Sequence, residues 1–312
     1  MSVTIAIDIG GTQLRVAVYP KDSIKPINVQ RAPTHGIEDS TYDRLTALID
    51  SSWPKEPVNV ISIAAPGPLD PKTGVLFSTP NIKEWVNFPI AEKLNSRYGV
   101  PVYLNNDAKM AAVGEWRYGA GKGHHNVLYL TISTGIGGGV ILDDQLLLGQ
   151  RGLATELGHV TVIQNGPLCS CGRFGHLEAV ASGVAIAKYV SEKIAEGRKS
   201  VLASEATITA RAVAEAAQQG DKLAKEAFVR AGTFIGQATA GFLHIFNPSI
   251  VIFGGGVSNS GDLILDPIKE SMRRNVMDPA YLDDLKIAIA KLGDDAGLLG
   301  SLTQARAQLS KK

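Results

Sequence analysis

Residues near the start of the chain have types and a spacing that suit phosphate binding. The stretch "IAIDIGGTQLRVAVY" (residues 5–19) places Asp8 before Gly10 and Gly11, and the hydroxyl of Thr12 follows them. Apolar and polar residues alternate on both sides, so the glycines join two strands. A Walker loop and a dinucleotide fingerprint both open a helix, and this pattern excludes them. The glycine N–H groups could contact phosphate, and Asp8 could hold Mg²⁺ through water.

A second stretch repeats the same order of strand, turn and strand. In "VLYLTISTGIGGGVIL" (residues 127–142), the turn contains Thr134 and Gly135. Two facing turns of this kind could hold one polyphosphate, although either turn alone could be an ordinary hairpin. The duplication suggests two related lobes.

A carboxylate that could act as a base lies in the alanine-rich stretch "NNDAKMAAVGEWRYG". Its Asn/Asp start and glycine stop predict a helix from about residue 106 to 118, with Asp107 in the first turn. The alternative is that Asp107 only caps this helix.

Further along the chain, apolar spacing predicts three more helices. One covers residues 221–246 and ends where Asn-Pro follows, and the last covers about residues 296–309. The stretch "SIVIFGGGVSNSGDLIL" (residues 249–265) predicts a short buried strand, three glycines and a helix capped near Ser258 or Ser260. Strands dominate early and helices late, which favours an α/β chain of two lobes.

Composition limits the class of protein. The 312 residues suit two domains or one long one, and 31 basic against 30 acidic residues give a net charge of +1. Because no dense basic stripe is present, we expect no nucleic-acid partner. No apolar run approaches the ~20 residues of a membrane span, and no signal peptide is recognisable, so we expect a cytoplasmic protein without membrane association.

The two cysteines of the chain, Cys169 and Cys171, are separated by one residue. This spacing suits a disulfide between them poorly. Reduced thiols and metal ligands both remain open as roles.

These motifs together resemble a known superfamily. "DIGGT" (residues 8–12), "STGIGGG" (133–139) and "FGGGVS" (253–258) are similar to the two phosphate elements and the adenosine element of the sugar kinase, heat-shock and actin ATPases. "ELGH" (156–159) and "CSCGRFGHLEA" (169–179) resemble, more narrowly, the ROK family of bacterial sugar kinases and repressors. The likeness runs from residue 5 to about 300.

The resemblance implies a fold and a set of site residues. The fold is a two-lobed actin-like ATPase (ribonuclease H-like) fold, with a small lobe of residues 1–117, a C-terminal helix of 298–312 packing back on it, and a large lobe of 118–297. A cleft between the lobes would close on the sugar. The implied catalytic base is Asp107, which would accept the proton of the sugar's 6-hydroxyl. The implied sugar contacts are Gly67, Asn106, Asp107, Glu156, His159 and Glu178. The implied ATP contacts are Asp8, Gly10, Gly11, Thr12, Thr134, Gly135, Gly254, Gly255 and Gly256.

The chain departs from the family pattern at two positions. In the resemblance a histidine and three cysteines bind a structural zinc, and here His176 replaces the last cysteine. Since imidazole also suits tetrahedral zinc, His159, Cys169, Cys171 and His176 could form a Cys₂His₂ site; the alternative is a pair of reduced thiols with two histidines. Lys109 stands where many relatives have asparagine, and we expect its side chain to face solvent.

The resemblance implies an ATP- and Mg²⁺-dependent hexose kinase, with glucose as the expected sugar and glycolysis as the setting. Fructose, N-acetylglucosamine, N-acetylmannosamine or allose are alternatives. A sugar-sensing regulator is a further alternative, but such regulators carry a DNA-binding domain before the "DIGGT" element, which here begins at residue 8. Relatives are commonly dimers, so we expect a homo-oligomer, a dimer or tetramer.

Overall fold

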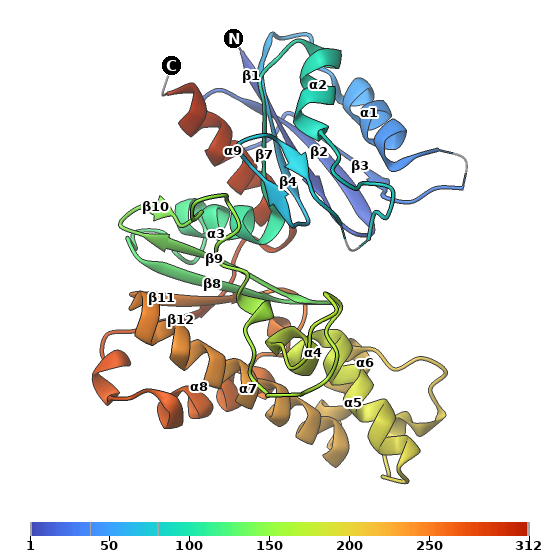
Figure 1. Cartoon of the computed structure of the whole chain (residues 1–312), viewed down its shortest axis with the longest axis vertical. Helices are drawn as coiled ribbons and strands as arrows, with labels where there is room; N and C mark the ends of the chain where they lie inside the picture. The colour runs from blue at the N-terminus through green and yellow to red at the C-terminus, as the bar shows by residue number, and fades with distance from the viewer. Residues whose placement is uncertain (1, 38, 80, 311–312) are drawn as a thin grey trace. The chain divides into compact units, whose positions relative to one another are not determined.

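The computed structural model describes residues 2–37, 39–79 and 81–310 and divides the chain into two compact units (Figure 1). The first contains residues 1–123, 145–155 and 291–312, and the second contains residues 124–144 and 156–290. These units differ from the expected lobes in three ways. The first unit extends beyond residue 117 to residue 123, and it also includes residues 291–297, which were expected in the large lobe. Residues 145–155 group with it as well, although no sequence signal sets them apart from their neighbours.

The first unit is built on a five-stranded sheet of order β3-β2-β1-β4-β7. Neighbours β1, β2 and β3 are antiparallel, whereas β4 and β7 run parallel to β1. The strands are β1 (Val3–Ile9), β2 (Gln13–Pro20), β3 (Asn28–Pro33), β4 (Val58–Ala65) and β7 (Val102–Asn106). A separate small hairpin consists of β5 (Leu69–Asp70) and β6 (Val75–Leu76).

Helices cover both faces of this sheet. α1 (Thr41–Ser52) and α2 (Ile90–Tyr98) enclose the larger apolar core, to which β1 contributes Ile5, Ile7 and Ile9. α9 (Ala296–Leu309) packs Leu298 and Leu302 on the opposite face, against the alternate residues of β1 and β2. The alternation of the opening stretch thus reflects a sheet that is buried on both sides.

α3 (Asp107–Tyr118) follows β7 directly and packs closely on α9. A Cβ placed on Gly300 of α9 would lie 1.8 Å from the carbonyl oxygen of Met110 in α3. Only glycine permits this approach of the two backbones. The C-terminal helix therefore fixes the helix that carries Asp107.

A second five-stranded sheet has the same order, β10-β9-β8-β11-β12, and its strands β9, β8, β11 and β12 belong to the second unit. β8 and β9 form an antiparallel hairpin, and β11 and β12 run parallel to β8. The strands are β8 (Val127–Ile132), β9 (Ile136–Leu142), β10 (Gln145–Leu146), β11 (Ile250–Gly254) and β12 (Lys286–Ile289). The two sheets share one connectivity, which agrees with the duplication seen in the sequence.

The helices of the second unit include α7 and α8, which lie side by side (Figure 1). Their bounds are α4 (Leu177–Ala181), α5 (Gly183–Ala195), α6 (Ala210–Gln218), α7 (Lys222–Phe246) and α8 (Asp262–Asn275). The prediction that Ser258 or Ser260 caps α8 is wrong. Both serines lie in a 3-10 turn, and α8 begins at Asp262 after Gly261, whose φ is +60°. Within the described residues, no helix is long and apolar enough to cross a membrane.

Candidate active site

The first glycine turn joins β1 to β2, as predicted. The N–H of Gly10 donates to the carbonyl of Gln13 (2.9 Å), and the hydroxyl of Thr34 donates to the carbonyl of Gly10 (2.7 Å). Gly10 is thus used to close the turn, so its predicted contact with phosphate through N–H is not favoured by this geometry. Gly11 and Thr12 lie at the tip of the turn.

Asp8 stands directly opposite Arg15 in the β1–β2 ladder, and the Arg15 guanidinium contacts its Oδ2. The carboxylate also lies against the start of α9, where a Cβ on Gly297 would be 3.0 Å from Oδ2. Burial raises the pKa of Asp8 above its ordinary value, while Arg15 acts in the opposite direction. Nη1 of Arg15 is buried and has no hydrogen-bond partner within the described residues. The Asp8 carboxylate is therefore held by a cation of its own hairpin.

Asp107 is the first residue of α3, and Asn106 is the cap of that helix. Oδ1 of Asn106 accepts the N–H of Lys109 (3.1 Å), whereas Oδ1 of Asp107 accepts the N–H of Ala108 (2.7 Å). The N-cap of α3 is therefore Asn106, and Asp107 lies in the first turn as predicted. The amide of Asn106 also faces Gly67, where a Cβ would stand 3.3 Å from Nδ2. The structure thus brings together Gly67, Asn106 and Asp107 at the ends of β4 and β7.

Lys109 does not face solvent, and that expectation is wrong. Its side chain is buried, with 1% of the residue exposed. Nζ donates to the carbonyl of Gly152 (3.2 Å). Gly152 lies in segment 145–155, which belongs to the first unit although the sequence analysis placed it in the large lobe. The burial of Lys109 depends on this segment and could not be read from the α3 pattern alone.

The second glycine turn joins β8 to β9. The N–H of Ser133 donates to the carbonyl of Gly135 (2.9 Å), and the N–H of Gly183, at the start of α5, donates to the carbonyl of Ser133 (2.8 Å). Thr134 is exposed at the tip. The turn is therefore placed next to the first residue of a helix, where N–H groups favour anions.

Glu178 of α4 supports this second turn. Its Oε2 accepts the N–H of Ile136 (3.0 Å), and a Cβ on Gly135 would lie 2.4 Å from the same oxygen. Its Oε1 accepts the hydroxyl of Ser170 (2.8 Å) and lies 3.5 Å from Sγ of Cys169. The Glu178 carboxylate thus connects the second glycine turn (residues 133–135, here called the phosphate turn) with the loop that carries Cys169 and Cys171 (here called the cysteine loop).

Glu156 precedes a 3-10 turn, Leu157–His159, that ends at His159 and packs on β9. A Cβ on Gly158 would lie 1.9 Å from the carbonyl oxygen of Ile136. Within the second unit, the predicted sugar contacts Glu156, His159 and Glu178 therefore lie around the phosphate turn.

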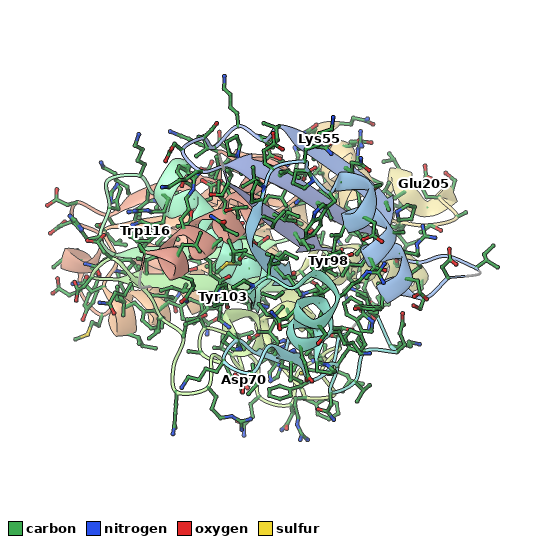
Figure 2. All side chains as sticks on the ribbon, turned by 90° about the horizontal axis from the view of Figure 1, so that it is seen from above. Lys55, Asp70, Tyr98, Tyr103, Trp116 and Glu205 are labelled. Carbon is green, nitrogen blue, oxygen red and sulfur yellow. The ribbon has the colours of Figure 1, made fainter. Side chains whose placement is uncertain are left out.

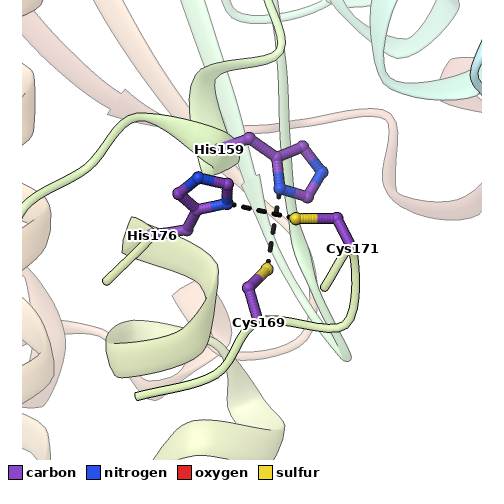
Figure 3. Close-up of side chains that lie close together, drawn as sticks. All are labelled: His159, Cys169, Cys171 and His176. Carbon is purple, nitrogen blue, oxygen red and sulfur yellow. Dashed lines mark hydrogen bonds between the residues drawn. The ribbon is translucent and has the colours of Figure 1, made fainter. Parts of the chain in front are cut away.

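Four predicted metal ligands come together in this unit (Figure 3). The ligand atoms of His159, Cys169, Cys171 and His176 all lie within 4.8 Å of one another. Sγ of Cys169 is 3.7 Å from Nδ1 of His159, and Sγ of Cys171 is 3.2 Å from Nδ1 of His176. Zn–N and Zn–S bonds at tetrahedral angles give an N···S separation of about 3.5 Å, so this donor set fits zinc.

Two short pairings bring these ligands together. Thr161 pairs with His176, and Leu168 pairs with Phe174, so the loop folds back beside the 3-10 turn. Burial lowers the pKa of His176, which favours the neutral imidazole that binds metal. Burial raises the pKa of the Cys169 thiol to about 11, and a coordinated zinc would have the opposite effect because it deprotonates its thiol ligands.

A cavity of about 950 Å³ lies in the second unit. It is bounded by the phosphate turn at Ser133 and Thr134, and by Gly256 of the third glycine run. The predicted contacts Gly254 and Gly255 directly precede Gly256 in the sequence. Gly255 has a φ of +83°, and a Cβ there would lie 2.3 Å from the carbonyl oxygen of Ile132, so the glycine is required for the strand-to-turn packing.

The first residues of α5 and α6 also line this cavity. The sequence analysis did not identify these residues as part of a site. α5 contributes Gly183 and Lys188, and α6 contributes Ala210 and Arg211. The hydroxyl of Thr209 accepts the N–H of Ala212, so the start of α6 is readable as a capping signal. That both helices begin at one cavity depends on tertiary packing. The two helix N-termini favour an anionic group in the cavity, whereas Lys188 and Arg211 are paired with Glu192 and Glu215.

The model of the ROK family matches residues 4–308. The glucokinase of Thermotoga maritima is 36% identical over 303 residues, which cover 95% of each chain. The crystal structure of a ROK family glucokinase from Streptomyces griseus in complex with glucose and AMPPNP is 35% identical, with a TM-score of 0.83 over 98% of this chain and 99% of that one.

A ROK family transcriptional regulator, described as a homolog of the Escherichia coli MLC protein, is 27% identical, with a TM-score of 0.88 over 98% of this chain and 78% of that one. Kinases and regulators thus share this fold. The family predicted from the motifs is confirmed, and so is the two-lobed α/β fold class. The chain belongs to the ROK family.

Proposed function

We infer that this chain is an ATP-dependent hexose kinase that converts glucose to glucose 6-phosphate. The observation that carries this inference is the similarity, over nearly the whole chain, to a glucokinase crystallised with glucose and an ATP analogue. Glucokinase relatives at 33–36% identity agree with it.

Asp107 is the proposed general base. The first turn of α3 holds it, and α9 fixes that helix. We propose that its carboxylate accepts the proton of the 6-hydroxyl as the oxygen attacks the γ-phosphorus, while the bond from that phosphorus to the β–γ bridging oxygen breaks and ADP leaves. Positioning and charge neutralisation contribute most of the catalysis in phosphoryl transfer.

The proposed sugar contacts are Gly67, Asn106, Glu156, His159 and Glu178. His159 can serve both sugar and metal, because a ring bound to zinc through Nδ1 retains an N–H donor at Nε2. Glu178 accepts from Ser170 and Ile136, yet a carboxylate has about four acceptor sites, so it can still accept a sugar hydroxyl.

The proposed nucleotide site in the second unit is the cavity with the second glycine turn, and a phosphate-binding role is also proposed for the first glycine turn. N–H groups at Gly11 and Gly135 and the hydroxyls of Thr12 and Thr134 would contact phosphate oxygens. Mg²⁺ enters as part of the substrate Mg·ATP. Arg15 contacts Oδ2 of Asp8, so Oδ1 is the proposed acceptor for a water on that ion.

Zinc is a proposed structural component held by His159, Cys169, Cys171 and His176. It would stiffen the loop on which Ser170 contacts Glu178. Purified protein should contain about one zinc per chain, and Cys169→Ser should lose most of it. A stoichiometry near zero in the wild-type protein would remove zinc from this proposal.

We further propose a homo-oligomer that works in the cytoplasm at the entry to glycolysis. Sedimentation analysis of the purified chain tests the first of these. A monomer at micromolar concentration would contradict it.

The function is tested by ADP production from Mg·ATP with a panel of glucose, fructose, mannose, allose, N-acetylglucosamine and N-acetylmannosamine. We expect the highest kcat/KM with glucose. A different preferred hexose would correct the substrate and keep the kinase. ADP production that no sugar increases, together with sugar binding, would favour a regulator instead.

A further inference from the structure

Lys109 is a buried cation in an unfavourable place. It lies in the first turn of α3, where the positive end of the helix dipole opposes its charge. Lysine is rarely buried without partners, because its ammonium loses hydration. A lysine with 1% exposure therefore needs compensating contacts, and these indicate what it does.

Two groups of Lys109 contact two different parts of the first unit. Its backbone N–H donates to Oδ1 of Asn106 (3.1 Å) and so orients the amide next to the proposed base. Its Nζ donates to the carbonyl of Gly152 (3.2 Å), 43 residues further along the chain. One residue thus connects the start of α3 with the segment 148–155.

The accepting carbonyl has a fixed direction. Gly152 is buried with a φ of +76°, and a Cβ there would lie 2.3 Å from Cδ of Pro71. No other residue fits this position without displacing the proline. The segment continues directly into Glu156, a proposed sugar contact.

Other contacts of the same segment are exposed. Nζ of Lys72 donates to the carbonyl of Gln150 (2.9 Å), and the guanidinium of Arg151 lies 5.7 Å from the ring centre of Phe77. Asp70 (Figure 2) accepts the N–H of Lys72 (2.8 Å) in the turn of the small β5–β6 hairpin. Exposed contacts of this kind contribute little, so among these described contacts the hydrogen bond from the buried ammonium of Lys109 contributes most to holding the segment.

We propose that Lys109 is a positioning residue for the sugar site. Its ammonium holds segment 148–155 against the first turn of α3, so that the backbone leading to Glu156 keeps a fixed relation to Asn106 and Asp107. This role determines the KM for the sugar and leaves the KM for ATP unchanged. The effect on KM rests on the proposed kinase function, whereas the effect on segment order does not.

The test compares Lys109→Met with Lys109→Arg and with Lys72→Met as the matched exposed control. Lys109→Met should raise the KM for glucose about tenfold, because a hydrogen bond to a charged group is lost, with kcat and the KM for ATP within twofold of wild type. Lys109→Arg keeps the charge and a donor and should recover most of this loss. Lys72→Met should change the KM for glucose less than twofold.

Limited trypsin digestion gives a second readout without any substrate. Cleavage after Arg151, followed by mass spectrometry, should be about tenfold faster in Lys109→Met than in Lys109→Arg. Equal cleavage rates and an unchanged KM for glucose would overturn the proposal. A raised KM for ATP alone would overturn it in favour of a phosphate contact. Faster cleavage in a protein without kinase activity would leave the positioning role standing and remove the proposed function.

Discussion

The two glycine turns have similar sequences but are held in different ways. In the first, the carboxylate is Asp8, and its partner Arg15 stands directly opposite in the same hairpin. In the second, the carboxylate is Glu178, which reaches the N–H of Ile136 from 42 residues away. Similar local patterns can therefore depend on local or on distant support.

This difference has a functional consequence. In the first hairpin, the charge of Asp8 is compensated by Arg15 of the same hairpin, and Asp8 also lies against Gly297 at the start of α9. The second turn shares its carboxylate with Ser170 of the cysteine loop, and it also borders the cavity proposed for the nucleotide. Changes in the cysteine loop should therefore alter the structure of the second turn and leave the first turn unchanged.

Among the changes that test this comparison, removal of the shared carboxylate has the largest expected effect. Glu178→Ala should raise the KM for both glucose and ATP, each by about tenfold or more, because one side chain serves the phosphate turn and the sugar. Steady-state kinetics with each substrate varied in turn measures this. A change confined to the KM for glucose would show that Glu178 does not support the turn.

Metal removal should have an intermediate effect. Chelator treatment should increase hydrogen exchange at the N–H of Ile136 by about tenfold, since the loop that carries Ser170 loses its anchor. Exchange in residues 8–15 should stay unchanged and serves as the internal control. Equal increases in both turns would contradict the distinction between local and distant support.

The smallest expected effect concerns pH and the first turn. Burial raises the pKa of Asp8 in the folded protein, so the stability that this group contributes is full below about pH 4 and is lost as the pH rises through the folded pKa. A double variant, Asp8→Asn with Arg15→Met, removes both charges together. The melting temperature of the wild type minus that of the double variant should fall by about 2 °C or more as the pH rises from 4 to 7. A difference that grows with pH would show that Arg15 outweighs burial.

Sequence reasoning was most successful where a structure depends on nearby residues. Alternation predicted the strands on both sides of Gly10 and Gly135, and spacing predicted α7 and α9 almost to the residue. The four metal ligands also come together as predicted. Cys169, Cys171 and His176 are close together in the sequence, and only His159 comes from a separate element, the 3-10 turn.

Sequence reasoning failed where distant segments decide the outcome. The buried ammonium of Lys109 donates to the carbonyl of Gly152, which is 43 residues away in the sequence. Nothing in the sequence of α3 indicates this contact. The support of Ile136 by Glu178 has the same origin. The start of α8 was misplaced for a local reason, because Ser258 and Ser260 have capping residue types but belong to a 3-10 turn.

The central claim is that Asp107 removes the proton from the sugar hydroxyl that attacks ATP. The most direct measurement is the single-turnover rate of glucose 6-phosphate formation by wild type and Asp107→Asn, with ATP affinity measured on the same samples. We expect the rate to fall by a factor on the order of 10³ with ATP affinity within twofold of wild type, since general bases contribute 10²–10⁴. A variant that retains a tenth or more of the wild-type rate would contradict this assignment.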